Sequence, residues 1–287
     1  DIKSPTTGDW IFGSEVTIQH LEKIRPDREI FNSRRSKTRY LDRIEVALFK
    51  SGIGCPYGCT FCYCRELNGG KYIRSDYNRL FGEMERVGAR HSWIVDDILL
   101  RDIEDANRFI EASNNHIYSG EIIAYLRADF VYRFPELMPQ LFKAGLKEAI
   151  IGFEAPFDSQ LEEYKKGMSA ETYKQVCDTL KTAGIDLIAL FIVDPSYTHS
   201  DFKNLRMFIR ELQIGVYTIS IFTPLKGTSD YEVYKEKIKD LRPEKSDFLH
   251  LILPSTLPKL LFYLEFYLSH LMLLKSGRVW KYILKRN

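Results

Sequence analysis

Two patterns of apolar residues alternate along most of this chain, one typical of strands and one typical of helices. Short apolar runs rich in β-branched and aromatic residues predict strands at Val46–Phe49, Trp93–Val95, Ile122–Leu126, Ala149–Phe153, Leu187–Val193 and Tyr217–Phe222. Between them, apolar residues at helical spacing predict helices at Ser75–Gly88, Ile103–Ser113, Pro135–Ala144, Ala170–Ala183, Asp201–Leu212 and Ser229–Lys239. Strands separated in this way by helices are typical of βα units around a parallel sheet.

The number of these units predicts the architecture. About six βα units fit the chain, fewer than the eight of a closed barrel. We therefore expect an α/β fold with a partial (β/α)6 barrel over residues 45–240. Gly145 and Gly184 stand where a helix should end before the next strand. Residues 1–44 are polar and rich in Lys and Arg, which predicts an N-terminal connector with one short helix near Val16–Ile24.

The tail, residues 241–287, has a different character. It is dense in Leu, Phe and Tyr, and Pro254 and Pro258 interrupt it. A stripe at helical spacing predicts a C-terminal helical appendage that packs across the open side of the barrel: Leu260, Leu264, Tyr267 and Leu271. The alternative is a helix on a membrane surface or a lid over an apolar substrate. No apolar run is long enough to cross a bilayer.

Composition narrows the class of protein. With 287 residues, 45% of them hydrophobic, the chain can form one large α/β domain or one domain with a small appendage. A formal net charge of +2 gives the whole molecule no strong attraction to nucleic acid, so no nucleic-acid partner is expected. Five cysteines without a secretory signal pattern indicate a reducing, cytoplasmic compartment rather than a disulfide scaffold.

Three of the five cysteines lie close together shortly after the first predicted strand. Cys55, Cys59 and Cys62 stand in the run Gly54-Cys55-Pro56-Tyr57-Gly58-Cys59-Thr60-Phe61-Cys62. Closely spaced thiolates in a cysteine-poor chain indicate metal chemistry. Structural metal sites are normally closed by four protein ligands, whereas three leave one coordination position for a substrate or cofactor.

A zinc knuckle is the alternative, with Cys64 as its fourth ligand. In an extended segment, however, Cys62 and Cys64 would point to opposite faces. Zinc loops usually draw a second, distant pair of Cys or His, and the remaining Cys177 lies in a predicted helix.

The order Cys-x3-Cys-x2-Cys, with aromatic Phe61 before the last cysteine, resembles the radical S-adenosylmethionine (SAM) enzymes. In that family the three thiolates hold a 4Fe–4S cluster, and SAM chelates the fourth iron. The resemblance implies reductive cleavage of SAM to a 5′-deoxyadenosyl radical, which abstracts a hydrogen atom from the substrate. The cofactors carry this chemistry, so no protein side chain is assigned as catalytic.

Polar residues follow several predicted strands, at the end where a βα barrel gathers its functional groups. Asp96 and Asp97 follow the second strand. Two adjacent carboxylates repel each other, which favours exposure to solvent or a bound cation. The alternative is an N-cap of the next helix by Asp97 or Asp102.

The third and fourth strands end in further charged residues. Arg127 could pair with the carboxylate of SAM, and the alternative is a salt bridge with Asp129 or Glu154. Gly152, two residues before Glu154, permits close backbone approach. The Glu154 carboxylate could accept hydrogen bonds from a ribose or an amino group.

These strand ends extend the resemblance over Leu21 to Tyr234. They resemble the branch of radical SAM enzymes that is usually fused to a cobalamin-binding domain, through Pro26-Asp27-Arg28, Val95-Asp96-Asp97, Arg127-Ala128-Asp129, Gly152-Phe153-Glu154, Ala183-Gly184-Ile185 and Thr223-Pro224-Leu225-Lys226-Gly227-Thr228. Known members include C-methyltransferases, hopanoid-tailoring enzymes and an oxidative cyclase of bacteriochlorophyll synthesis.

The resemblance also implies roles for single residues. Cys55, Cys59 and Cys62 would be the cluster ligands, and Phe61 would present its backbone to the adenine of SAM. The amino, carboxylate and ribose groups of SAM would be surrounded by Asp96, Arg127 and Glu154.

Two departures from the branch stand out. Asp194 occupies a position where the branch usually has glycine, which predicts a polar side chain in the SAM or substrate pocket. None of the six histidines lies in the Asp-x-His-x-x-Gly loop that binds cobalamin in this branch. Cobalamin would therefore require a domain outside this chain.

The sequence thus predicts a radical SAM enzyme that activates a C–H bond of a hydrophobic or lipid-like small molecule, for C-methylation or oxidative rearrangement. An external electron donor of the flavodoxin or ferredoxin type and peripheral membrane contact by the tail are expected. One rival is a tRNA methylthiotransferase, although residues 1–54 lack the cysteine trio that its second cluster needs. The other is a zinc-stabilised binding protein whose basic N-terminal stretch contacts an acidic partner.

Overall fold

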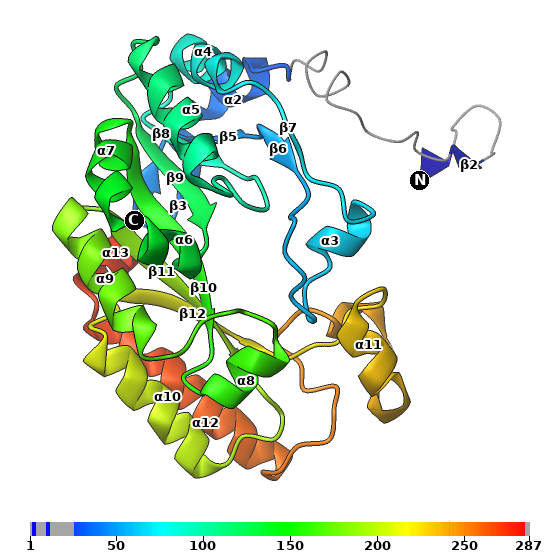
Figure 1. Cartoon of the computed structure of the whole chain (residues 1–287). Coiled ribbons are helices and arrows are strands. Elements are labelled where there is room, and N and C mark those ends of the chain that lie inside the picture. Colours follow the sequence, from blue (N-terminus) through cyan, green and yellow to red (C-terminus); the bar gives the residue numbers. More distant parts are fainter. Residues whose placement is uncertain (1, 4–9, 12–25, 241, 285–287) are drawn as a thin grey trace.

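The structure is a computed structural model that describes residues 2–3, 10–11, 26–240 and 242–284 (Figure 1). The helix expected near Val16–Ile24 lies outside these residues. Within them, parallel strands form a six-stranded sheet. Its strands are β5 (Val46–Phe49), β8 (His91–Ile94), β9 (Glu121–Leu126), β10 (Leu146–Glu154), β11 (Asp186–Val193) and β12 (Val216–Ile221). All six predicted strands are confirmed, with ends that shift by at most three residues.

The spatial order of the strands is β12-β11-β10-β9-β8-β5, so neighbours in space are also neighbours in sequence. The two edge strands, β5 and β12, are the first and the last of the sheet. This is the topology of an open, partial βα barrel, as the sequence predicts. All six strands end at the same edge, where loops from different units can meet.

Helices cover the outer face of this sheet (Figure 1). They are α4 (Tyr77–Val87), α5 (Ile103–Asn114), α6 (Ala128–Arg133), α7 (Met138–Lys143), α9 (Thr172–Ala183) and α10 (His199–Glu211). Their apolar faces form one core with the sheet, in which Phe81, Phe109, Phe130, Val176 and Phe202 are at most 1% exposed.

One predicted helix is divided in the structure. The stretch Pro135–Ala144 begins with a 3-10 turn at Pro135–Leu137 and continues as α7, while α6 precedes it. Phe134 separates the two at φ −129° and ψ 54°. A residue before proline is disfavoured in the α region because the proline ring crowds its backbone, so α6 ends there.

The floor of the barrel is closed by a hairpin and the last helix. The hairpin joins β3 (Arg39–Tyr40) to β4 (Arg43–Ile44), and Tyr40 packs on the inner residues Ile123 and Ile150. The fully buried Glu148 pairs with Arg43 at 3.1 Å and with Arg278 of α13 (Gly277–Leu284) at 2.6 Å. Two guanidinium groups therefore compensate this buried carboxylate.

The tail forms the helix that the sequence predicts, α12 (Lys259–Leu271), but its orientation differs from the prediction. It packs beside α10 and β12 on the outer side of the sheet and buries Phe262, Glu265, Phe266 and Ser269. The predicted core stripe is exposed instead, at Leu260, Leu264, Tyr267 and Leu271.

The expectation that this stripe packs against the barrel is therefore wrong. Two polar residues hold the buried face in its place. Glu265 pairs with Arg206 of α10 at 2.6 Å, and the Tyr217 hydroxyl donates to the Ser269 carbonyl at 2.6 Å. A count of apolar residues cannot foresee a buried face that depends on such partners.

The remaining elements are short. They comprise β1 (Ile2–Lys3), β2 (Trp10–Ile11), α2 (Glu29–Arg34), β6 (Gly52–Ile53), α3 (Cys64–Leu67), β7 (Ile73–Arg74), α8 (Asp158–Glu163) and α11 (Ser229–Tyr234). No helix in the described part of the chain has the length and apolar character needed to span a membrane. The division into 1–44, 45–240 and 241–287 stays a prediction.

Candidate functional site

The cysteine loop, residues 54–63, leaves the sheet after β5 (Figure 1). The antiparallel pair β6–β7 closes its base. Gly54 has φ +85°, and a Cβ there would lie 1.9 Å from the Lys71 carbonyl oxygen, so only glycine fits. Cys55, Cys59 and Cys62 are half-buried and form no disulfide.

Asp96 at the end of β8 anchors the chain just before this loop. One carboxylate oxygen accepts the backbone N–H groups of Ser51 at 2.7 Å and Gly52 at 2.9 Å. The other accepts the Ser51 hydroxyl at 2.6 Å and the Arg74 guanidinium at 3.0 Å. Asp96 is only 1% exposed, so protein donors surround it. It positions the loop, and direct contact of Asp96 with SAM stays a prediction.

Asp97 performs a similar task one residue further along. Its Oδ2 accepts the backbone N–H of Gly54, the first residue of the loop, at 2.8 Å. The helix N-cap that the sequence offered as an alternative is Asp102, which accepts the Asp105 N–H at 2.9 Å. The two adjacent carboxylates therefore both hold the cysteine loop.

Arg127 brings a positive charge to the cysteines. Its guanidinium lies 3.7 Å from the Tyr57 ring centroid, and its Nη1 lies 3.7 Å from the Cys59 sulfur. Nε donates to Asp129 at 2.7 Å, and Nη2 donates to the Lys166 carbonyl at 3.0 Å. The salt bridge that the sequence offered as the alternative is thus made with Asp129, while Glu154 pairs with Lys166. These contacts fix the guanidinium beside the loop.

Glu154 ends β10 in a left-handed backbone conformation, with φ +62°. Its carboxylate pairs with the Lys166 ammonium at 2.9 Å, and both side chains are less than 10% exposed. A Cβ on Gly152 would lie 2.1 Å from Glu154 Oε1, so this glycine makes room for the carboxylate. Sequence reasoning missed Lys166, because it lies in a turn after α8 where no periodic pattern marks it.

The thiols differ in how readily they lose a proton. A hydrogen bond from the Cys64 thiol lowers the pKa of Cys62 to about 7, although burial opposes this. The same bond raises the pKa of Cys64. Burial raises the pKa of Cys55. Cys64 thus supports a neighbouring thiolate.

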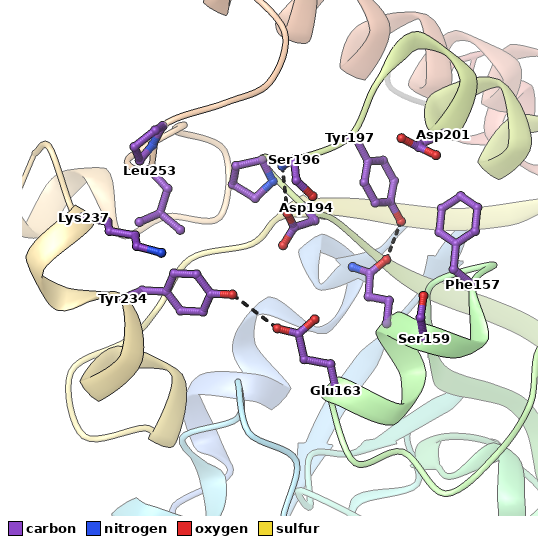
Figure 2. Close-up of a pocket in the computed structure, with 13 residues that line it drawn as sticks. Phe157, Ser159, Glu163, Asp194, Ser196, Tyr197, Asp201, Tyr234, Lys237 and Leu253 are labelled. Carbon is purple, nitrogen blue, oxygen red and sulfur yellow. Dashed lines mark hydrogen bonds between the residues drawn. The ribbon is translucent and has the colours of Figure 1, made fainter.

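Residues of α8, of the segment after β11 and of α11 line a cavity of about 580 Å³ (Figure 2). Asp194, Glu163 and Tyr234 line it, and the Tyr234 hydroxyl donates to Glu163 at 3.3 Å. The polar side chain expected at position 194 therefore faces a pocket. The three cysteines, Arg127 and Glu154 do not line this cavity.

A row of aromatic rings begins in the cysteine loop. Phe61 of the loop packs edge-on against Tyr164, and Tyr164 stacks on Phe222. The Thr60 hydroxyl donates to the Glu163 carbonyl at 3.4 Å. The loop and the wall of the cavity are thus in direct contact.

Comparison with known proteins identifies the family. Residues 49–209 match the model of the radical SAM superfamily, more than half of the chain. The chain belongs to the radical SAM superfamily. Its members use a 4Fe–4S cluster and SAM.

Relatives of this radical SAM chain are considerably longer. It is 23% identical over 262 residues to the hopanoid C-3 methylase of Methylococcus capsulatus, covering 91% of this chain and 50% of that protein. It is 27% identical over 220 residues to a bacteriochlorophyllide d C-8(2)-methyltransferase of Chlorobaculum tepidum, covering 70% and 48%. The chain spans about half the length of these relatives.

A solved structure agrees with the radical SAM fold. The cobalamin-dependent SAM radical enzyme OxsB, with aqua-cobalamin and SAM bound, superposes with a TM-score of 0.60 at 16% identity. The match covers 78% of this chain and 40% of that one. At this identity the similarity concerns the fold alone.

The donor set of the radical SAM chain fits an iron–sulfur cluster. Its loop offers three thiols free of disulfides, next to the positive charge of Arg127. Across the described residues, no three Cys, His, Asp or Glu side chains converge on a position for a single metal ion. Thiols that bind separate corners of a cluster need no such convergence. Family membership replaces the interpretation as a zinc-stabilised binding protein.

Proposed function

We propose that this chain is the core of an enzyme that activates a substrate C–H bond for C-methylation or oxidative rearrangement of a hydrophobic small molecule. The cysteine loop at the ends of the barrel strands, in a chain of this superfamily, carries the proposal. The curated relatives named above modify a hopanoid and a bacteriochlorophyllide, both largely apolar. This supports the hydrophobic substrate class.

We assign Cys55, Cys59 and Cys62 as the cluster ligands. When bound, the cluster supplies the electron that cleaves SAM into methionine and a 5′-deoxyadenosyl radical. The hydrogen bond from Cys64 favours the thiolate form that ligation requires at Cys62. Asp96 and Asp97 hold the start of the loop, so that the thiols are presented from a fixed backbone.

We assign Arg127 to the carboxylate of SAM, Glu154 to its amino group and the Phe61 backbone to its adenine. Arg127 is held against Tyr57 and Asp129, which limits its freedom before SAM binds. The Glu154 carboxylate is paired with the Lys166 ammonium. The ammonium of SAM would compete with Lys166 for this carboxylate, so the Lys166 pair would lower the affinity for SAM.

The partners follow from the same proposal. An electron donor of the flavodoxin or ferredoxin type would supply the reducing equivalent, and cobalamin would enter through a domain outside this chain. Free thiols in the loop require a reducing compartment, for which we propose the cytoplasm. The exposed tail helix supports peripheral membrane contact.

Anaerobic reconstitution with iron and sulfide tests the proposal. The wild type should gain broad absorbance in the blue region and release 5′-deoxyadenosine from SAM and a reductant. Cys59→Ala should lose both properties. Cys177→Ala is the matched control: it removes a thiol outside the ligand set, in α9, and should keep the cluster. A wild-type protein that takes up no iron and sulfide would overturn the assignment.

A further inference from the structure

The tail helix α12 lies on the outside of the molecule beside α10 (Figure 1), and it exposes several large apolar side chains to solvent. We name this surface the α12 face; it consists of Leu260, Leu261, Leu264, Tyr267, Leu268 and Leu271. Leu260 is 80% exposed, Tyr267 59% and Leu271 56%. At about 100° per residue, the six side chains fall within an arc of about 120° on one side of the helix. A contiguous apolar stripe of this kind marks an interaction site.

The α12 face is held outward by specific contacts on the opposite side of the helix. Glu265 pairs with Arg206 at 2.6 Å and with His199 at 2.7 Å. Phe262 and Phe266 are at most 1% exposed in the core. The helix therefore cannot rotate its leucines inward without breaking the partly buried ion pair with Arg206 and uncovering two aromatic rings.

The C-terminal segment that contains α12 is basic in sequence. From residue 259 to the end it contains Lys259, Lys275, Lys281, Lys285 and Arg286, besides Arg278, which is ion-paired with Glu148. The same stretch contains a single acid, Glu265, and this acid is buried and ion-paired. No exposed carboxylate of α12 would oppose a negatively charged surface.

These features fit a lipid surface with anionic headgroups. Helices that lie in a membrane interface combine an apolar face with basic residues, and aromatic side chains favour the boundary. Tyr267 lies on the α12 face, and Trp280 of α13 is 46% exposed. No described helix can span a bilayer, so the contact would be made from one side.

We propose that the α12 face docks this protein in the plane of an anionic lipid surface. The inference specifies the membrane contact that the proposed function includes. It rests on the proposed function in one respect: docking would give the enzyme access to an apolar substrate. The docking itself requires no cluster.

Flotation of the reconstituted protein with lipid vesicles tests the docking. Vesicles of phosphatidylcholine containing about one third phosphatidylglycerol should carry the wild type, while pure phosphatidylcholine should carry far less. Binding should weaken at high salt, because part of the attraction is electrostatic. The double variant Leu264→Ser with Leu268→Ser should bind at least about tenfold more weakly.

Matched controls distinguish loss of docking from a general effect of a surface substitution. Ile117→Ser changes a side chain that is 87% exposed on another surface and should bind like the wild type. Iron content and 5′-deoxyadenosine formation are measured in the same samples. If the double variant keeps its iron content and 5′-deoxyadenosine formation but no longer binds vesicles, the docking is supported independently of the chemistry.

Three outcomes would overturn the docking. The wild type could fail to float with anionic vesicles, or the double variant could float equally well. Light scattering could also reveal a dimer that the double variant dissociates, without lipid binding; the α12 face would then contact a second copy of the chain. None of these results would affect the cluster assignment.

Discussion

Asp97 accepts the backbone N–H of Gly54 at 2.8 Å, which ties the end of β8 to the first residue of the cysteine loop. Asp96, next to it, holds Ser51 and Gly52 in the same way. The geometry of the three thiols therefore depends on two carboxylates from a neighbouring strand, about forty residues further along the chain.

Removing the Asp96 carboxylate should disturb both stability and cluster binding. Asp96→Ala leaves the buried Arg74 guanidinium without its carboxylate partner, which should cost about 3–5 kcal/mol in the free energy of unfolding. The iron content after reconstitution should fall with it, as measured beside urea unfolding. Asp76→Ala is the control: it removes an exposed N-cap of α4, should cost about 1 kcal/mol, and should leave the iron content unchanged. Wild-type iron content in Asp96→Ala would contradict the anchoring role.

The buried pair of Glu154 and Lys166 allows stability to be separated from SAM binding. Glu154→Gln leaves the Lys166 ammonium unpaired, which should cost about 3–5 kcal/mol in unfolding free energy. It should also weaken SAM binding at least about tenfold, or 1.4 kcal/mol, because the ammonium of SAM loses its carboxylate.

Adding Lys166→Met to that variant should restore most of the stability and none of the SAM affinity. Calorimetric titration with SAM and thermal unfolding report the two quantities independently. Recovery of SAM binding in the double variant would show that Glu154 does not contact the cofactor.

Gly152→Ala should affect SAM binding more than folding. The added Cβ would lie 2.1 Å from Glu154 Oε1, and the flexible end of that side chain can move away. We expect a stability loss of about 1–3 kcal/mol, with little measurable SAM binding. Gly215→Ala is the matched control, since its Cβ would meet only Ser276 Oγ at 3.8 Å. Equal SAM affinity in both variants would contradict the role given to Gly152.

The attachment of α12 should weaken in acid. Burial raises the pKa of Glu265, but hydrogen bonds from His199 and Arg206 outweigh burial and bring the pKa below its ordinary value. The carboxylate therefore stabilises the fold fully above about pH 4.3, the value expected when unfolded, and this stabilisation is lost as the pH falls through the lower folded value.

Glu265→Gln measures this contribution. At pH 7 its free energy of unfolding should be about 2 kcal/mol lower than that of the wild type. This difference should shrink below about pH 4.3. A difference that stays constant down to pH 3 would mean that the Glu265 charge does not hold the helix.

Local patterns predicted the parts of the fold that depend on neighbouring residues. Runs such as Val46–Phe49 and Ile122–Leu126 are strands in the structure because their β-branched and aromatic side chains suit a buried sheet. Gly184 ends α9 in a left-handed conformation, φ +80°, as its place in the sequence indicates. The cysteine spacing is equally local, and it identified the family.

The sequence alone determined the βα order, the partial barrel and the thiol trio, because each follows from a period or spacing within a few residues. The tertiary structure decided which charges meet. Ser51 and Asp96 are 45 residues apart, and Arg206 and Glu265 are 59 apart, so only the folded chain brings them together. It also decided which side of α12 faces water. The face that is buried carries Phe262 and Phe266 together with the ion pair of Glu265 and Arg206, so turning the leucines inward would uncover both rings and break this pair.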